Sequence, residues 1–498
     1  MALLLGGCAT TNIGSLYFVN ETPTALPPAG KDIFLTIDGT GNSGISRTNA
    51  ARLFEIVDAS SGMRTRPGNE LSGATGQQAG AIPSTSDRRL ATYYAEGVGS
   101  RGNVAGLALG QGMDQDVQQA YAFLIRNYRP GDRIYLSGFS RGAYGVRILA
   151  GLVALAGIPD AASAGIRGAE VDRLAKELFA AHKWKGRSGS VRVRNRERTA
   201  RINTVLAARN LPAAPPLARV RIEALAIWDT VAALNMPDRT KDPTEYRAEF
   251  FDQTCNINAV FHALALDDNR AYSFTPILAR GERLRAGCPD GMPPPLVREV
   301  WFAGAHADVG GGYTRHAQVD GHLQGVSLNW MLDQLRSEFL FAPEARVFED
   351  PLGPIRAAKE SNVFYKGLSR FFRRPLSYEA QTVGYDSRPV IHISALERLL
   401  RLTDLDARFD NCRDRGGSRK VGPVQLCSAD LPEYGFIPEM GDCLYRSVGG
   451  YALKPGQQCI TVECEGGGPA ARRDDGYCGR EALLADRLRQ RPPELPAG

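Results

Sequence analysis

Short apolar runs alternate with amphipathic stretches between residues 31 and 335. The runs cover residues 33–37, 133–138, 220–228 and 299–305. Continuous apolar runs of this length are typical of strands buried on both faces of a parallel sheet. Parallel strands bring their carboxyl ends to one edge, so Asp38, Asp229 and His306, which follow three of the runs, are predicted to lie at that edge.

Helical spacing of apolar residues fills the intervals between these runs. One segment passes through positions 117–124 and stops near Pro130, and another, residues 143–155, follows a sharp turn at Ser140. Strands that alternate with helices favour an α/β fold, a mostly parallel sheet with helices on both faces. The run GFSRG at residues 138–142 makes the predicted fold α/β-hydrolase-like. A lid insertion and a cysteine-rich C-terminal region complete the predicted architecture.

The chain is expected to divide into four parts. Residues 1–30 form a lipoprotein-like leader and a spacer, residues 12–30, that is rich in Thr, Pro and Gly. Residues 31–342 form the α/β-hydrolase domain. Residues 343–404 form an irregular extension, and residues 405–498 form the cysteine-rich C-terminal region. Within the hydrolase domain, residues 159–218 fit no sheet strand and are interpreted as a lid over the site.

Composition adds little to this picture, but one charge cluster does. Apolar residues make up 43% of the 498 residues and charged residues 23%, as in ordinary soluble globular proteins. The net charge of +6 is too small to indicate a partner, and no nucleic-acid binding is predicted. Trp184 precedes a basic run with Arg192, Arg194, Arg196 and Arg198. This run is either a solvated face or a membrane-facing surface for anionic lipid.

The N-terminus contains a possible lipidation site. Leu5-Gly6-Gly7-Cys8 resembles the lipobox of bacterial lipoproteins, although a basic region and most of an apolar stretch are missing ahead of it. A start codon assigned too far downstream would explain the difference, and a chance cysteine in an apolar terminus is the alternative. The lipobox predicts a protein of the bacterial cell envelope, anchored in the membrane through a lipid on Cys8 or periplasmic.

Cysteine usage agrees with export. With Cys8 set aside, eight of the nine cysteines remain, an even number that favours disulfides. Six are crowded into the C-terminal region: Cys412, Cys427, Cys443, Cys459, Cys464 and Cys478. A zinc site is the weaker alternative, because there is no CxxC pair and the nearest histidine, His392, lies outside the cluster. We expect no metal and no cofactor.

The run Gly138-Phe139-Ser140-Arg141-Gly142 has the GxSxG pattern of a nucleophile elbow. Residues two before and two after the serine must be small in so tight a turn, and Gly138 and Gly142 meet this need. A strand pattern precedes the run and an apolar helix follows it, which is the context that the motif requires. Ser140 is therefore predicted to be the nucleophile of a serine hydrolase.

A serine nucleophile needs a histidine base, held in turn by a carboxylate. Among the six histidines, His262, His306 and His392 are the contenders, and His306 is preferred because it directly follows a strand. His262 is interpreted as a packing residue on a helix. Asp229 lies between serine and histidine in the chain, as the acid does in α/β-hydrolases. The alternative interpretation is that Asp229 caps the start of a helix. Asp308 is the alternative acid.

The oxyanion hole needs backbone N–H donors that meet the charge developing on a substrate carbonyl. The amide of Arg141 is one candidate donor, and Gly39 or Thr40, in the loop after the first strand, is the candidate for the second. Asp38 and Asn42 are placed to fix that loop, for which an ordinary turn is the alternative.

Several motifs together carry a resemblance to a known family. They are DGT (residues 38–40), YAEGVG (94–99), GFSRGAY (138–144), WDTVA (228–232), HALALD (262–267) with Arg270 and Phe274, and WFAGAHADVGGGY (301–313). Over roughly residues 31–335 the chain resembles the type VI secretion phospholipase effector-like family of α/β-hydrolases. The resemblance implies a triad of Ser140, Asp229 and His306, membrane phospholipid as the substrate and phospholipase A activity.

Three questions stay open at this point. The chain is either injected into rival cells or retained at its producer's envelope. A non-catalytic envelope lipoprotein that binds lipid or protein through a hydrolase-like scaffold is the alternative function. The Asp-Gly-Thr motif also resembles that of haloacid dehalogenase phosphatases, but Thr36 stands where their nucleophilic aspartate would be, which disfavours that class.

Overall fold

The structure is a computed structural model that describes a defined part of the chain. The described residues are 17–20, 30–39, 47–60, 89–97, 111–185, 190–231, 255–268, 270, 274, 276–280, 282–285, 287–312, 322–336, 346–351, 353, 355, 390–392, 394–395, 418–421, 424–427, 444–447, 450–453, 461–463, 472–473 and 476–477.

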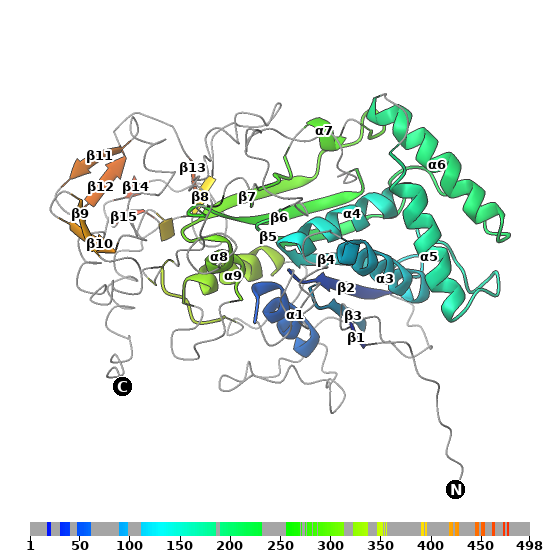
Figure 1. The fold of residues 1–498 in the computed structure, drawn as a ribbon, viewed down its shortest axis with the longest axis horizontal. Helices are drawn as coiled ribbons and strands as arrows, with labels where there is room; N and C mark the ends of the chain where they lie inside the picture. Colours follow the sequence, from blue (N-terminus) through cyan, green and yellow to red (C-terminus); the bar gives the residue numbers. More distant parts are fainter. Residues whose placement is uncertain are drawn as a thin grey trace, which may run out of the picture.

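A single twisted sheet of nine strands forms the centre of the molecule, in the order β1-β3-β2-β4-β5-β6-β7-β8-β13 (Figure 1). The strands are β1 (Tyr17–Asn20), β2 (Lys31–Ile37), β3 (Arg89–Ala95), β4 (Arg133–Phe139), β5 (Ile222–Trp228), β6 (Ile257–Ala265), β7 (Leu296–Phe302), β8 (Val390–His392) and β13 (Thr461–Glu463). Among the strands that the structure describes, only the β1–β3 pair of this sheet is antiparallel. The predicted buried parallel strands are confirmed, with ends that differ by a few residues.

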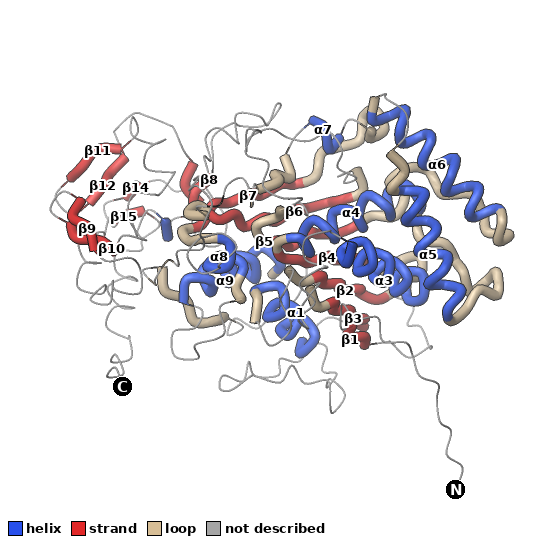
Figure 2. The backbone as a smooth tube through the Cα atoms, viewed as in Figure 1, coloured by secondary structure: helices blue, strands red, loops and turns tan. Residues whose placement is uncertain are grey.

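Helices cover both faces of the sheet, as Figure 2 shows. One face carries α1 (Asn49–Ser60), α8 (His306–Gly310) and α9 (His322–Leu335). The other carries α3 (Gln111–Asn127) and α4 (Arg141–Ala156), on which α5 (Ala169–His182) and α6 (Val191–Ala207) pack. Strand β2 shows how the pleat separates the two cores: Leu35 belongs to the α3–α4 core and Phe34 to the α1–α9 core, both fully buried. The predicted α/β-hydrolase fold is thereby confirmed.

Segments outside residues 31–342 also contribute to the sheet. The predicted spacer supplies β1, the predicted irregular extension supplies β8, and the cysteine-rich region supplies β13, which pairs with β8. Three two-stranded hairpins lie further along the cysteine-rich region: β9 (Ser418–Val421) with β10 (Val424–Cys427), β11 (Leu444–Ser447) with β12 (Gly450–Leu453), and β14 (Arg472–Arg473) with β15 (Gly476–Tyr477). Parallel pairing needs a long crossover connection, so β8 and β13, which pair in parallel, join the sheet from a distance in sequence.

The predicted lid, residues 159–218, lies elsewhere than over the carboxyl ends of the strands. Its described part forms α5 and α6, which pack on each other and on α3 and α4. The amide of Ala218 donates to the carbonyl of Ala154 in the last turn of α4 at 2.9 Å. Arg192 pairs with Asp290, which lies six residues ahead of β7. The α5–α6 pair therefore lies at the amino edge of the sheet, at the right of Figure 1.

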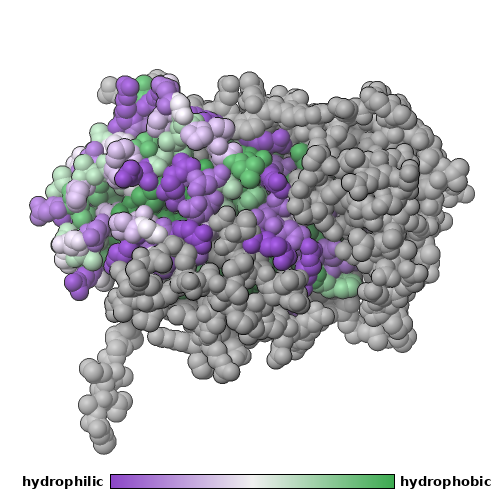
Figure 3. Space-filling view, turned by 180° about the vertical axis from the view of Figure 1, so that it is seen from behind, coloured by the Kyte–Doolittle hydropathy of each residue, from purple (hydrophilic) through white to green (hydrophobic). Residues whose placement is uncertain are grey.

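The surface at this end is mixed in character. Hydrophilic side chains are interspersed with hydrophobic ones there in Figure 3, which views the molecule from behind. Trp184 is 40% exposed, and the Arg201 guanidinium lies 3.6 Å from the centre of its ring. Among the described residues, no helix is long and apolar enough to span a membrane.

Candidate active site

Ser140 lies at the tip of a strained turn between β4 and α4. Its backbone has φ 57° and ψ −125°, a left-handed region that few side chains adopt, and its amide donates to the carbonyl of Trp228 at 3.0 Å. A Cβ added at Gly142 would lie 2.1 Å from the carbonyl oxygen of Ile37, and one at Gly138 would lie 2.8 Å from the amide of Ala143. The two glycines are therefore required by close packing, as the motif predicted.

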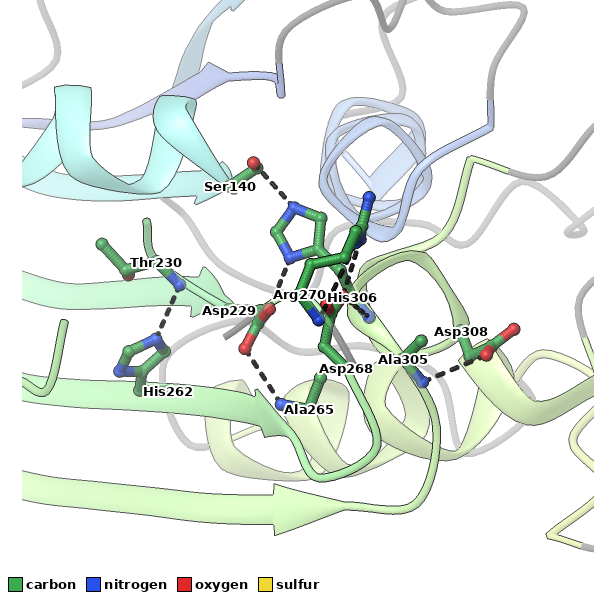
Figure 4. Close-up of polar contacts among 10 residues, drawn as sticks. All are labelled: Ser140, Asp229, Thr230, His262, Ala265, Asp268, Arg270, Ala305, His306 and Asp308. Carbon is green, nitrogen blue, oxygen red and sulfur yellow. Dashed lines mark hydrogen bonds and ion pairs between the residues drawn. The ribbon is translucent and has the colours of Figure 1, made fainter. Parts of the chain in front are cut away.

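His306 is the first residue of α8, directly after the strand β7 and its short connection. Its Nε2 lies 2.7 Å from the hydroxyl oxygen of Ser140 (Figure 4). The rings of Phe139 and Phe274 lie 4.6 Å and 4.8 Å from the imidazole. Its backbone amide donates to Asp268 Oδ2 at 3.2 Å. These contacts fix both the ring and the backbone of His306.

Asp229, at the end of β5, completes a chain of hydrogen bonds. Its Oδ2 is bonded to His306 Nδ1, and its Oδ1 accepts a bond of 3.0 Å from the amide of Ala265. The side chain is completely buried, and the backbone φ is 39°. A carboxylate at Nδ1 holds the proton on that atom, so the lone pair of Nε2 faces the hydroxyl of Ser140. The arrangement can take a proton from the serine.

Burial lowers the pKa of His306, although the hydrogen bond and the charge of Asp229 act in the opposite direction. Desolvation favours the neutral imidazole. A neutral base is the form that accepts a proton, so the environment keeps His306 ready for this task at neutral pH.

Asp308, the alternative acid, has a different position. Its Oδ2 accepts a hydrogen bond of 3.1 Å from the amide of Ala305, and its side chain points away from His306 (Figure 4). This is a bond to the amino end of α8, where a carboxylate is favourable. The carboxylate bonded to His306 is that of Asp229.

The loop after β2 packs directly against the turn at Ser140, as the short distance between Gly142 and Ile37 requires. Asp38 begins this loop and is buried; it accepts hydrogen bonds of 2.6 Å from Thr48 Oγ1, Tyr94 Oη and the amide of Gly39. Desolvation raises the pKa of Asp38 to about 6.

The candidate oxyanion donors are only partly accounted for. Because the Gly39 amide donates to Asp38, this N–H points to a carboxylate within the protein rather than to a substrate position. Thr40 lies outside the described residues. Arg141 is the first residue of α4, directly after Ser140, which is the position the motif assigns to one donor.

Two other histidines do not join this chain of hydrogen bonds. His262 is fully buried on β6, a strand rather than the predicted helix, and pairs with Glu299 at 2.8 Å. Its apolar neighbours gave it a core pattern that does not separate short strands from helices. His392 is buried on β8, bonded to Ser394 Oγ at 2.9 Å and stacked on Phe302 at 4.6 Å.

Asp268 and Phe274 contact His306 but were not assigned a role from the sequence. Asp268 also pairs with Arg270 at 2.6 Å, and the Arg270 guanidinium lies 3.7 Å from the centre of the Phe274 ring. Arg270 and Phe274 belong to one of the motifs noted above, which was the signal available. The contacts of Asp268 and Phe274 with His306 depend on the path of the chain after β6, which the sequence pattern does not reveal.

The remaining predictions concern cysteines and metals. Cys255 and Cys288 form a disulfide, so one pair outside the C-terminal cluster is oxidised. The side chains of the six C-terminal cysteines, and all of Cys8, lie outside the described residues. Within the part of the chain that the structure describes, no group of three or more His, Cys, Asp or Glu residues is arranged to hold a metal.

Comparison with known proteins identifies the central part of the chain. Residues 31–334 match the family model described as type VI secretion system phospholipase effector Tle1-like, catalytic domain. An uncharacterized protein of Saccharomyces cerevisiae is 28% identical over 155 residues, which cover 27% of this chain and 19% of that protein.

Solved structures are similar at low identity. An uncharacterized Pseudomonas aeruginosa protein is 17% identical with a TM-score of 0.33, covering 61% of this chain and 46% of that one. The Tle1 effector, solved bound to the VgrG spike of the type 6 secretion system, is 19% identical with a TM-score of 0.22, covering 62% and 58%. The chain thus spans less than two thirds of the length of these proteins.

Proposed function

The chain belongs to the family of type VI secretion phospholipase effector Tle1-like catalytic domains, and from this premise we propose that it is a serine hydrolase of membrane phospholipids. The bond cleaved is a carboxylic ester between a fatty acid and glycerol, the chemistry of a phospholipase A. The observation that carries this proposal is the buried chain of hydrogen bonds from Ser140 through His306 to Asp229.

In the first half of the proposed reaction, the Ser140 hydroxyl attacks the ester carbonyl while His306 Nε2 takes its proton. Asp229 stabilises the imidazolium that forms. Backbone N–H groups, that of Arg141 among them, stabilise the oxyanion of the tetrahedral intermediate. When the intermediate collapses, His306 returns the proton to the departing glycerol oxygen, which leaves a lysophospholipid and an acyl group on Ser140.

In the second half, water replaces the alcohol. The water oxygen attacks the acyl carbonyl while His306 accepts a proton from the water, and a second tetrahedral intermediate forms. Its collapse releases the fatty acid and returns the proton to Ser140. The enzyme is regenerated without a metal or a redox partner, as expected for this class of chemistry.

We also propose that the protein acts in the cell envelope, lipid-anchored at Cys8 or periplasmic. The Cys255–Cys288 disulfide supports this location, because disulfides persist in oxidising compartments. The lipobox-like run at Cys8 supports a lipid anchor. Mass spectrometry of a membrane fraction should find the peptide that spans Cys8 in acylated form, and an unmodified peptide would refute the anchor.

The central test is hydrolysis of vesicles of phosphatidylethanolamine and phosphatidylglycerol with defined acyl chains, read as fatty acid and lysophospholipid by mass spectrometry. Ser140→Ala should abolish release of both products. Ser137→Ala is the matched control, because Ser137 is a fully buried serine on β4, the strand that leads into the turn at Ser140. It should retain activity.

A fluorophosphonate probe provides an assay that needs no natural substrate. The wild type should be labelled at Ser140, and labelling should be absent in Ser140→Ala. A folded wild type that neither reacts with the probe nor releases fatty acid would overturn the proposal in favour of a lipid- or protein-binding scaffold. Labelling without phospholipid hydrolysis would keep the serine hydrolase and reject the substrate class.

A further inference from the structure

A second buried histidine lies directly behind Asp229. His262, on β6, is completely buried and stands opposite Glu299 of β7 in the register of the sheet. Its Nδ1 lies 2.8 Å from Glu299 Oε1. Glu299 Oε2 accepts bonds of 3.0 Å from Arg280 Nε and 3.1 Å from the Arg280 amide. This cluster of three ionisable groups has no part in the proposed reaction scheme.

The other ring nitrogen of His262 contacts the backbone next to the proposed acid. His262 Nε2 accepts a hydrogen bond of 3.1 Å from the amide of Thr230, the residue that follows Asp229 (Figure 4). Asp229 has a positive φ of 39°, a conformation that persists only where the surroundings hold it. The His262–Thr230 bond fixes the peptide that leaves Asp229.

The same short segment is bonded to the turn at Ser140 and to Ile277. The carbonyl of Thr230 accepts from the amide of Ile277 at 2.9 Å, and the amide of Val231 donates to the carbonyl of Ser140 at 3.4 Å. Residues 229–231 thus join the end of β5 to the turn at Ser140. A shift of the Thr230 peptide would move Asp229 relative to His306.

The chemistry of the cluster fixes the protonation of His262. Burial opposes a charge on Glu299, but the hydrogen bond from His262 and the charge of Arg280 hold its pKa at about 2, so it is ionised. An ionised carboxylate at Nδ1 requires a proton on that nitrogen, and an N–H donor at Nε2 requires a lone pair there. His262 is therefore the neutral tautomer with its proton on Nδ1.

Charges from every side face this ring. Glu299 on β7 and Asp229 after β5 favour the protonated ring, whereas Arg147 on α4 disfavours it, and burial, the largest influence, lowers the pKa of His262. Arg280 completes the set through Glu299. Protonation of Nε2 would direct an N–H against the N–H of Thr230 and break the bond.

We propose that His262 is a positioning residue for ester hydrolysis: a neutral imidazole that holds the Asp229–Thr230 peptide through Nε2 and thereby keeps the Asp229 carboxylate on His306. The inference rests on the proposed function for its chemical meaning. It makes a separate claim, that the bond to Thr230, rather than the ion pair with Glu299, is what the site requires.

Two substitutions separate these bonds. In His262→Gln the side-chain amide reaches the place of Nε2, so its oxygen can accept from Thr230. In His262→Asn the amide reaches the place of Nδ1, so it can donate to Glu299 but leaves the Thr230 amide without its acceptor. If His262 were needed only for packing or for pairing with the charge of Glu299, His262→Asn would be the more active variant.

The expected result is the opposite ranking. His262→Gln should retain most of the kcat, while His262→Asn should lose about 100-fold, the loss expected when a reacting group is displaced by about 1 Å, with KM little changed. The rate of fluorophosphonate labelling at Ser140 should follow the same order. Equal rates in the two variants, or a faster Asn variant, would overturn the inference.

A measurement on the native side chain tests the protonation state without any substrate. In Ser140→Ala protein labelled with ¹⁵N-histidine, the His262 ring should give the signature of a neutral ring with a proton on Nδ1, assigned by its through-space contact with the Thr230 amide proton. An imidazolium at pH 7.5, or a proton on Nε2, would refute the inference even if both variants failed to fold. Absence of hydrolysis in the wild type, with this signature present, would count against the proposed function alone.

Discussion

The two edges of the central sheet differ in the side chains that their backbone positions. At the carboxyl edge, Ser140 and Asp229 both have positive φ, and close packing requires glycines on either side of the serine. At the amino edge, the helices α5 and α6 bury apolar residues such as Leu178 and Ile202, and the Cys255–Cys288 disulfide joins the segments that precede β6 and β7. Positive φ also occurs within residues 159–218, at Asn210 and Ala218, but Ser140 and Asp229 at the carboxyl edge carry side chains of the proposed reaction.

Helix α4 explains why the predicted lid lies at the far edge. The helix begins at the Ser140 turn, and its 16 residues extend about 24 Å at 1.5 Å per residue. It therefore carries the chain from the carboxyl edge to the amino edge, where residues 159–218 begin. An insertion that follows the nucleophile helix starts at the amino edge of the sheet, so it covers the site only if it runs back to the carboxyl edge.

The largest difference between the edges should appear when Asp229 is replaced. Asp229→Asn keeps the shape but no longer holds the Nδ1 proton of His306, so kcat should fall about ten-thousand-fold. Asp308→Asn is the matched control, because it weakens the bond to the Ala305 amide at the start of α8, whereas the imidazole of His306 is bonded to Asp229. It should cost about 1 kcal/mol of unfolding free energy and leave kcat within an order of magnitude of the wild type.

Initial rates on a short-chain ester, with thermal unfolding of each variant, give this ranking. The reverse order, with Asp308→Asn the more damaging to kcat, would assign the acid to Asp308. Similar losses in both would indicate that the start of α8 as a whole controls His306.

The pH dependence of hydrolysis should report the environment of His306. The proposed base must be neutral, and burial lowers its pKa below the ordinary value of 6.5. The ring then stays neutral to lower pH, so the acid limb of kcat/KM should have its midpoint below pH 6.5 and fall by about tenfold per pH unit beneath it. A midpoint above pH 6.5, in protein shown to be folded by circular dichroism, would contradict the buried geometry.

Some features of this site follow from local sequence rules, and others do not. The GxSxG run placed Ser140, and strand ends placed Asp229 and His306, because elbows and parallel strands have strict local patterns. The role of His262 depends on its register opposite Glu299, which is set by pairing between strands far apart in sequence. The path of residues 159–218 depended on the direction of α4, a property of the assembled fold.

At the amino edge, removing the Cys255–Cys288 disulfide should affect stability and not chemistry. The pair closes a loop of 33 residues, and its loss should lower the unfolding free energy by about 2–4 kcal/mol. In the double variant Cys255→Ser/Cys288→Ser, denaturant unfolding should show this loss while kcat at 25 °C stays at the wild-type value. A parallel fall in kcat would show that the two edges are coupled through the sheet.

The smallest effect is expected from the basic surface of α6. The arginines that are not buried, Arg192, Arg194 and Arg196, lie at the amino edge, and at 0.1 M salt charges are largely screened beyond about 10 Å, well short of the length of α4. Arg198 is different, because it is buried and donates to the carbonyl of Trp184 at 3.0 Å. The triple variant Arg192→Gln/Arg194→Gln/Arg196→Gln should therefore hydrolyse both a soluble short-chain ester and anionic vesicles at the wild-type rate, whereas Arg198→Gln should lower the melting temperature.

If the triple variant lost activity on anionic vesicles alone, and more so at low salt, α6 would be a membrane-facing surface as its sequence suggested. Loss on both substrates would instead mean that these arginines support the fold.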